Sequence, residues 1–283
     1  MSAPLLHAPQ VSTMGSKSQT SVVGPAEVSQ AADPQVAVLE RRVADLQQDC
    51  LELEHFLRAA THDLEEPLRM ISSFGELLVH EHGEQLEGSA REYLGYVCDG
   101  AARMQTLLRD LVSYSRLTTK AGSHAWVSLA EIIEDVEIDL ASTLEREGGR
   151  IDMVGDLPRV YVVRSLVHQV VQQLVSNAIR FRRRDVPPQV RVSAVATGHG
   201  LRIEFADNGE GLDPRHSERV FEPFVRLHPR GRYRGSGLGL AICRRAIEHH
   251  GGRITLRSTP GHGTVVVFSL PDTGPQPDGD QHS

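Results

Sequence analysis

The sequence predicts a helical hairpin that forms a dimeric four-helix bundle, followed by an α+β two-layer sandwich. Two apolar series predict the hairpin: one begins at Leu39, and the other begins at Leu94 after a charged loop. After Arg116, amphipathic helical segments alternate with short strands, an order that is typical of a layered domain of helices and antiparallel strands.

The first apolar series repeats at spacings of four and three residues, which is the pattern of a coiled coil. It comprises Leu39, Val43, Leu46, Cys50, Leu53, Leu57, Ala60 and Leu64. The second series comprises Leu94, Val97, Ala101, Met104, Leu108 and Leu111. A second copy of this hairpin would complete a four-helix bundle, so we expect a homodimer. The alternative is a helical pair that packs on the rest of its own chain.

These patterns divide the chain into five segments. Both ends lack a helical or strand period and are rich in polar residues, proline and glycine, so we expect them to be disordered. A polar stretch with Gly122 and Ser123 predicts a linker between the hairpin and the sandwich. The predicted boundaries are 1–34, 35–117, 118–126, 127–271 and 272–283.

The sandwich begins with a predicted capping box, in which Ser128 and Glu131 satisfy backbone N–H groups at the start of a helix that runs to about Glu145. The apolar periods then predict strands, a long helix, a hairpin of strands, a further helix and two closing strands. These elements lie at about 150–154, 159–163, 165–181, 190–194, 201–205, 238–249, 254–258 and 264–270.

Composition narrows the class of function. The formal net charge of −7 argues against a nucleic-acid-binding protein, because such proteins carry a basic face. The three cysteines lack the spacing of a metal site or a disulfide framework, which indicates a reducing compartment. No membrane span and no signal peptide are evident, so we expect a cytoplasmic protein.

The heptad register places His62 at an outward f position, when Leu57 and Leu64 occupy a positions and Ala60 occupies d. The adjacent Asp63 can hold one imidazole nitrogen protonated and leave the other as a nucleophile. The alternative is an ordinary surface histidine beside an aspartate. Pro67 lies inside the helical pattern and predicts a kink just after His62.

Two glycine-rich turns predict an anion-binding site. Their glycines allow backbone N–H groups to approach an anion, and the second turn opens a helix whose N-terminus favours negative charge. Asp207, at the end of an apolar strand, could accept a hydrogen bond from the amino group of a base. Two purely structural turns are the alternative. The residues of these turns are Asp207, Asn208, Gly209, Glu210 and Gly211, and then Gly235, Ser236, Gly237, Leu238, Gly239 and Leu240.

A row of amides on one helix predicts a metal site. Gln169, Gln173 and Asn177 are spaced by four residues and share a face, and Arg180 lies one turn further on. Such a row could hold a hydrated Mg²⁺, and Arg180 could contact phosphate oxygens. The alternative is a solvated helix face, which we favour for Gln169.

Between the two glycine-rich turns, an apolar anchor precedes an arginine-rich loop that predicts a lid over an anionic ligand. The anchor runs from Phe221 to Phe224, and the loop carries Arg226, His228, Arg230, Arg232 and Arg234.

Five segments together resemble the histidine kinase family, in its order and at similar spacing. The segment from Phe56 to Leu68, which contains His62, resembles the phosphoacceptor box. The other four segments resemble the N box, the first glycine box, the F box and the second glycine box, and begin at Asn177, Asp207, Phe221 and Gly235. The finer pattern, in residues 62–69 and 224–228, resembles the kinase region of phytochrome-type light sensors.

The resemblance implies a dimerisation and phosphoacceptor domain followed by a Bergerat-type ATP-binding domain. It implies a protein-histidine kinase that phosphorylates His62 with Asp63 as acid/base residue, and passes the group to an aspartate in the receiver domain of a response regulator. ATP and Mg²⁺ would be held by Asn177, Arg180, Asp207 and the glycine boxes. The segment 1–34 is too short for a chromophore-binding domain, so we expect the input from an upstream sensor protein or from this segment.

Three residues depart from the family pattern. Gln173 replaces a second asparagine of the N box, Arg180 replaces a lysine, and Glu66 stands where kinases with strong phosphatase activity carry Thr or Asn. We therefore predict a kinase without strong phosphatase activity. The alternatives are a catalytically weak dimeric scaffold that binds ATP, and an ATPase or serine kinase that shares only the nucleotide fold.

Overall fold

The computed structural model describes residues 34–116, 122–198, 200–227 and 235–271. The predicted disordered ends apart from Pro34, the first four residues of the predicted linker (118–121) and the arginine-rich part of the predicted lid lie outside these residues. The chain divides into two compact units, Met1–Asp45 and Leu46–Ser283. Only the first residues of one helix are described in the first unit.

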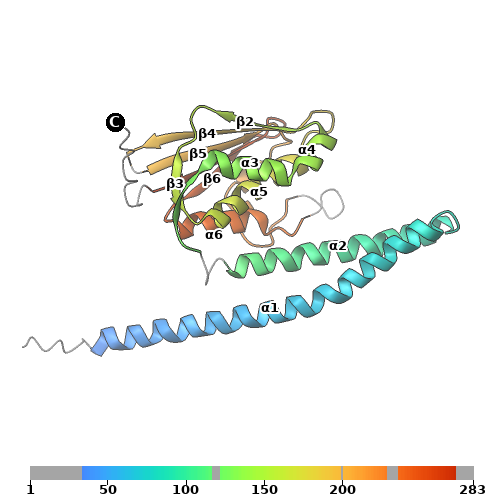
Figure 1. Cartoon of the computed structure of the whole chain (residues 1–283), viewed down its shortest axis with the longest axis horizontal. Helices are drawn as coiled ribbons and strands as arrows, with labels where there is room; N and C mark the ends of the chain where they lie inside the picture. Colours follow the sequence, from blue (N-terminus) through green and yellow to red (C-terminus); the bar gives the residue numbers. More distant parts are fainter. Residues whose placement is uncertain (1–33, 117–121, 199, 228–234, 272–283) are drawn as a thin grey trace, which may run out of the picture. The chain divides into compact units, whose positions relative to one another are not determined.

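Two long helices form the predicted hairpin (Figure 1). Helix α1 spans Pro34–His82 and α2 spans Gly88–Arg116, joined by a short turn. Helix α1 continues through Pro67 as a single helix. Within the part of the chain that the structure describes, no helix combines the length and apolarity needed to cross a bilayer.

The two helices approach closely near their shared turn. A side chain at Gly75 would meet the Cys98 thiol, because a Cβ atom there would lie 2.2 Å from Sγ. Leu68 and Ala101 are buried. The apolar series of the predicted coiled coil is nevertheless largely exposed in the single chain: Leu46 and Leu53 are 57% and 59% exposed.

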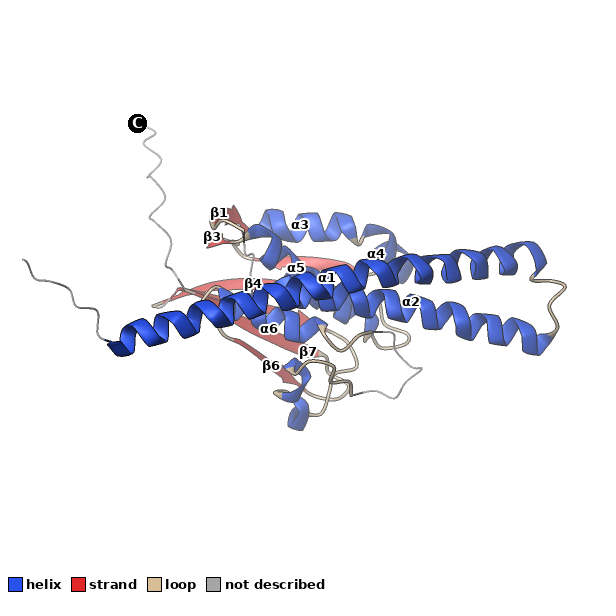
Figure 2. Ribbon diagram, turned by 90° about the horizontal axis from the view of Figure 1, so that it is seen from below, coloured by secondary structure: helices blue, strands red, loops and turns tan. Residues whose placement is uncertain are grey.

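The second domain is a sandwich in which helices lie against a sheet (Figures 1 and 2). The sheet has five strands. Its elements, in chain order, are β1 (Ala125–Ser128), α3 (Leu129–Asp139), α4 (Ala141–Glu147), β2 (Arg150–Val154), β3 (Arg159–Val162), α5 (Arg164–Arg180), β4 (Gln189–Thr197), β5 (Gly200–Asp207), η1 (Pro214–His216), η2 (Arg219–Phe221), α6 (Gly239–His249), β6 (Ile254–Ser258) and β7 (Thr264–Leu270). The strand order in the main sheet is β2-β4-β5-β7-β6, and β1 and β3 form a separate antiparallel pair.

Most predicted elements of the sandwich are confirmed within one or two residues. One of the two hydrogen bonds of the predicted capping box is confirmed: the backbone N–H of Glu131 donates to Ser128 Oγ at 3.4 Å. The predicted helix to Glu145 is instead two helices that meet at Leu140. Strand β1 begins at Ala125, inside the range predicted as linker.

The prediction of antiparallel strands was wrong for one pair. Strand β2 pairs with β4 in parallel, with Ile151 opposite Val190. The connection between these two strands runs through β3 and α5 and is long enough for the crossover that a parallel pair requires. The other pairs of the main sheet are antiparallel.

The core lies between the sheet and the helices α3, α5 and α6. Apolar residues from one face of each helix meet alternate residues of the strands, as expected where one face of a sheet is covered. Fully buried members include Ile133, Val167, Ile203, Ile242 and Phe268. This core fixes the ends of β5, α5 and α6, from which the candidate nucleotide site is built.

Candidate functional site

The main cavity is lined mostly by residues of the sandwich, from α5, the end of β5 and the start of α6, and also by Thr106 and Asp110 of α2. It brings together most of the residues predicted to bind a nucleotide, namely Asn177, Arg180, Asp207, Gly211, Gly235, Gly237 and Gly239. Gly209 and Leu238 do not line the cavity. Gln169 is also outside the lining, as expected for a residue of the solvated face.

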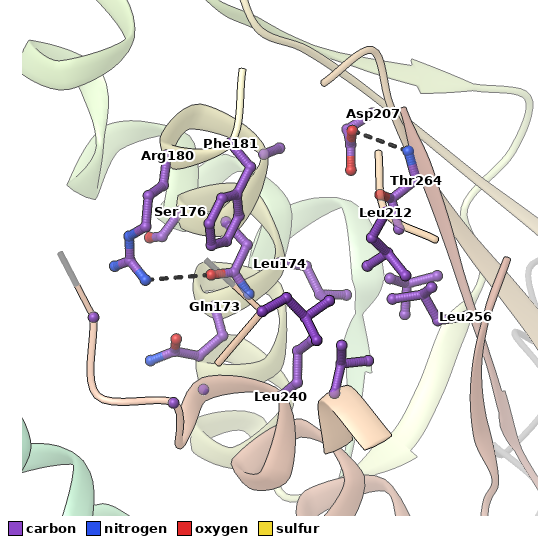
Figure 3. Close-up of a pocket in the computed structure, with 18 of the residues that line it drawn as sticks. Gln173, Leu174, Ser176, Arg180, Phe181, Asp207, Leu212, Leu240, Leu256 and Thr264 are labelled. Atoms are coloured by element: carbon purple, nitrogen blue, oxygen red, sulfur yellow. Dashed lines mark hydrogen bonds between the residues drawn. The ribbon is translucent and has the colours of Figure 1, made fainter. Parts of the chain in front are cut away.

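Asp207 is held at the end of β5 by two backbone donors. The N–H group of Gly209 donates to its Oδ1 at 2.8 Å, and the N–H group of Thr264 donates to the same oxygen at 3.1 Å, the second bond being drawn in Figure 3. Burial raises the pKa of this carboxyl group, and the two hydrogen bonds oppose the rise. Oδ2 accepts no hydrogen bond from a described residue, so it is available to a donor in the cavity.

The first glycine turn needs glycine for steric reasons. Gly211 has φ +66°, and a Cβ atom there would lie 2.1 Å from the carbonyl oxygen of Thr259. A Cβ at Gly209 would lie 2.7 Å from the carbonyl oxygen of Phe181. These contacts place the turn against the end of α5 and the loop before β7, and so fix Asp207 between them.

The second glycine turn leads into α6. Gly237 has φ +79°, and a Cβ atom there would lie 2.9 Å from the backbone of Phe224. Helix α6 begins at Gly239 and has no acidic residue in its first turn. Its first N–H groups therefore offer a favourable site for an anion beside the cavity. Leu238, the residue before the helix, is 1% exposed and packs in the core.

Helix α5 contributes polar side chains that reach the glycine turn. In Figure 3, Gln173 and Arg180 extend from α5 along one side of the cavity. A guanidinium nitrogen of Arg180 lies 3.5 Å from Oδ1 of Asn177, and a Cβ atom at Gly235 would lie 2.8 Å from Nη1. Burial lowers the pKa of Arg180, but an arginine stays charged at neutral pH.

A cavity with this arrangement suits a nucleotide. It has a carboxylate acceptor at one end, an arginine and an amide on one wall, and backbone N–H groups at a helix N-terminus. Among the described residues, no cluster of three His, Cys, Asp or Glu could hold a metal ion. A metal that enters with the phosphates and keeps most of its water would need only an oxygen such as that of Asn177.

Sequence reasoning missed the contribution of Thr264. Its backbone N–H holds Asp207, and the residue lines the cavity. The available signal was the turn that precedes it: Gly263 has φ +85°, and a Cβ atom there would lie 2.0 Å from the carbonyl oxygen of Asp207. The turn that contains Gly263 and precedes β7 is thus a third glycine turn at the same site.

His62 lies on α1 and is open to solvent. The side chains of His62 and Asp63 are both 83% exposed, and Nδ1 of His62 lies 3.4 Å from Oδ1 of Asp63. The carboxylate accepts from Nδ1 when that nitrogen carries the proton, which leaves the lone pair on Nε2. Nε2 has no hydrogen-bond partner among the described residues.

Two family models match the chain. Residues 52–120 match the His Kinase A (phospho-acceptor) domain. Residues 162–274 match the family of histidine kinase-, DNA gyrase B- and HSP90-like ATPases. The chain belongs to the histidine kinase family. The first match contains His62, and the second contains all the residues that line the cavity except Thr106 and Asp110 of α2.

Curated relatives agree with this assignment and bear out the resemblance to phytochrome-type kinases. The phytochrome-like protein Cph1 of Synechocystis is 33% identical over 237 residues, which cover 84% of this chain and 31% of the relative. Cyanobacterial phytochrome A of Nostoc is 34% identical over 230 residues, which cover 81% of this chain and 30% of the relative. The chain thus spans about a third of the length of these relatives.

Solved histidine kinases share the fold. Full-length ShkA, in complex with AMPPNP, matches with a TM-score of 0.58 and 25% identity over 77% of this chain and 45% of that chain. The kinase ThkA, in complex with the response regulator TrrA, matches with a TM-score of 0.54 and 20% identity over 83% of this chain and 66% of that chain. The predicted helical hairpin followed by a Bergerat-type sandwich is confirmed.

Proposed function

We propose that this chain is the kinase core of a two-component signalling protein. It binds ATP in the cavity of the sandwich, transfers the γ-phosphoryl group to His62, and then passes the group to an aspartate of a response regulator. The observation that carries the proposal is the exposed imidazole of His62, paired through Nδ1 with Asp63, in a chain that also holds a nucleotide-type cavity.

Asp207 is the residue proposed to recognise the base. Its Oδ1 is occupied by two backbone N–H donors, while Oδ2 has no partner among the described residues, and the residue lines the cavity. An adenine amino group can donate to this oxygen, and a hydrogen bond to a buried carboxylate is stronger than one between neutral groups. The base would then lie between the strand end and the apolar wall of α5.

The phosphates are proposed to lie toward the second glycine turn. The N-terminus of α6 and the guanidinium of Arg180 both favour negative charge there. Mg²⁺ bound with ATP would use Asn177 as its protein ligand and would neutralise charge on the phosphates during transfer. The proposed roles of Gly235, Gly237 and Gly239 are to let the backbone approach the phosphates.

The transfer step uses the lone pair on Nε2 of His62. Nε2 attacks the γ-phosphorus, a bond forms between nitrogen and phosphorus, and the bond from the bridging oxygen to the γ-phosphorus breaks to release ADP. The imidazole becomes positively charged during the attack. Asp63 stabilises that charge and can accept the Nδ1 proton, which leaves a neutral phosphoimidazole ring.

The hairpin is proposed to form a homodimer. In the single chain, Leu46, Leu53 and Leu64 lie exposed along α1, and Val97 and Met104 lie exposed on α2. Such contiguous apolar surface is unusual on a monomer, and its heptad spacing fits a four-helix bundle of two hairpins. We place the reaction in the cytoplasm, where ATP is supplied, with the input coming from an upstream sensor.

The proposal is tested by incubating the purified chain with ATP labelled at the γ-position and with Mg²⁺. The wild-type chain should acquire label that is lost in acid and stable in alkali, as expected for phosphohistidine. His62→Gln should remain unlabelled, although its ATP affinity is unchanged. Asn177→Ala should bind ATP with a weaker dependence on Mg²⁺ and label poorly.

Two outcomes would overturn the proposal. Label on the His62→Gln protein would assign the acceptor to another residue. A wild-type chain that binds ATP but acquires no label would instead identify a dimeric scaffold. Incubation of labelled protein with the receiver domain of a response regulator should move the label from His62 to the regulator.

A further inference from the structure

A second group on α1 faces the same solvent region as His62. A shallow depression on the helix surface is lined by His62, Glu65, Glu66 and Arg69. These residues are spaced by three, four and seven positions from His62, so they share one face of the helix. Arg69 also occupies the next f position of the heptad, one repeat after His62.

The direction of helical side chains brings Arg69 toward His62. Each Cα–Cβ bond in a helix tilts toward the N-terminus, so Arg69 leans back toward His62. The two Cα atoms are separated by about 10 Å along the axis, at roughly 1.5 Å per residue. A long arginine side chain and a phosphorylated imidazole together span that separation. His55, one heptad before His62, leans away from it.

The guanidinium of Arg69 is available for an anion. It makes no ion pair or hydrogen bond with a described residue, in contrast to Arg58, whose guanidinium pairs with Glu54 at 2.9 Å on the same helix. The side chain of Arg69 is exposed. It is the one cation among the four residues that line the depression.

We propose that Arg69 binds the phosphoryl group on Nε2 of His62. Its planar guanidinium can donate two parallel hydrogen bonds to phosphoryl oxygens, both as the group arrives from ATP and while it remains on the histidine. The proposal rests on His62 being the acceptor, as proposed above. Arg69 forms no covalent bond; it offsets negative charge next to the carboxylates of Glu65 and Glu66.

Those two carboxylates predict an electrostatic signature. A phosphoryl group carries nearly two negative charges, so Glu65 repels it while Arg69 attracts it. Neutralising Glu65 and neutralising Arg69 should therefore shift phosphorylation in opposite directions. A role of Arg69 in helix stability alone would produce no such pair of opposite effects.

The test compares Arg69→Ala, Arg69→Lys and Glu65→Gln in the full chain. The matched control is Arg41→Ala, an exposed arginine at an f position of the same helix, three heptads before His62. Initial rates of labelling are measured at saturating ATP, together with the half-life of phosphorylated His62 after ATP is removed. ATP affinity and helix content are measured for each variant.

We expect Arg69→Ala to lower the labelling rate about fivefold to tenfold, since a charge-assisted hydrogen bond at an exposed site is partly screened. Arg69→Lys should retain part of the rate, Glu65→Gln should raise the rate or the half-life, and Arg41→Ala should match the wild type. Added salt should reduce the difference between wild type and Arg69→Ala. ATP affinity should be the same in all variants.

The inference is overturned if Arg69→Ala labels within twofold of the wild type, or if Glu65→Gln and Arg69→Ala both lower the rate. These results are distinct from a failure of the proposed function. In the latter case the wild-type chain itself acquires no label, or His62→Gln is labelled as strongly as the wild type.

Discussion

The two domains of this chain build their functional groups in opposite ways. The sandwich has its own core, which holds in place the turns that line its cavity. The hairpin has few buried apolar residues in the single chain, and His62 is an open side chain on a helix. The first site depends on backbone precision, and the second depends on exposure and on what other groups bring to it.

The contrast between the two domains is tested most strongly by making the same substitution, glycine to alanine, in each domain. Gly211→Ala should unfold or distort the nucleotide site, because its φ is +66° and a Cβ atom would lie 2.1 Å from a carbonyl oxygen. The expected loss is about 3 kcal/mol or more of the free energy of unfolding. In α2, nothing lies within 4 Å of a new Cβ atom at Gly95, so Gly95→Ala should raise the free energy of unfolding by about 0.5–1 kcal/mol. Denaturant titration of both variants measures the two effects. Equal effects of the same sign would remove the contrast.

A charge on the apolar series should affect the hairpin and spare the sandwich. Leu53 is 59% exposed in the single chain and would be buried in the proposed dimer, so Leu53→Glu should favour the monomer. The expected cost to dimerisation is about 2–4 kcal/mol. Light scattering across a dilution series measures it, with Gln48→Glu at an outward position as the control. ATP affinity should not change. A wild-type chain that is monomeric at micromolar concentration would contradict the proposed dimer.

Asp207→Asn tests whether the charge of this carboxylate favours ATP binding at a cost to the stability of the fold. Burial raises the pKa of this carboxyl group, so its charge is costly in the empty cavity. An amide oxygen can still accept from Gly209 and Thr264, but the amide removes the charged acceptor for the base. We expect ATP affinity to fall roughly tenfold to a hundredfold, while the thermal unfolding temperature stays equal or rises. Calorimetric titration with ATP and thermal unfolding measure the two quantities; an unchanged affinity would refute the role in base recognition.

The smallest expected effect is a dependence of the stability of the sandwich on pH, through His250. His250 is buried, accepts from the backbone N–H of Val163 through Nε2 at 3.0 Å, and lies 2.7 Å from the carbonyl oxygen of Ala246 through Nδ1. Burial lowers its pKa in the folded state; the bond to Ala246 opposes this, and His124 and His249 lower the pKa further.

Folding therefore favours neutral His250. Its contribution to stability is complete above the ordinary histidine pKa of about 6.5, and declines as the pH falls from there through the lowered pKa of the folded state. Unfolding titrations between pH 7.5 and 5 should show this decline, and His250→Gln should reduce the slope. The same slope in the variant would assign the pH dependence to other groups.

The contrast also explains what the sequence could and could not predict. The position of Asp207 at the cavity could be predicted because it follows an apolar strand and precedes glycines, and the exposure of His62 because the heptad period fixes its direction. Thr264 was missed because it acts through a backbone N–H that any residue other than proline can supply, so the signal lies in the preceding Gly263 and not in the threonine itself. The parallel pairing of β2 with β4 depends on a partner far along the chain, on which the local period carries no information. Leu238 lies in sequence between two glycines that line the cavity, but its side chain packs in the core.

The most direct measurement of the central claim is to locate the phosphorus in the labelled protein. Phosphorus NMR and peptide mass spectrometry under alkaline conditions distinguish Nε2 from Nδ1 and identify the residue. The pairing of Nδ1 with Asp63 predicts a single phosphoryl group on Nε2 of His62, formed at the expense of ATP. Phosphorus on Nδ1, on another histidine or on a hydroxyl group would contradict the account.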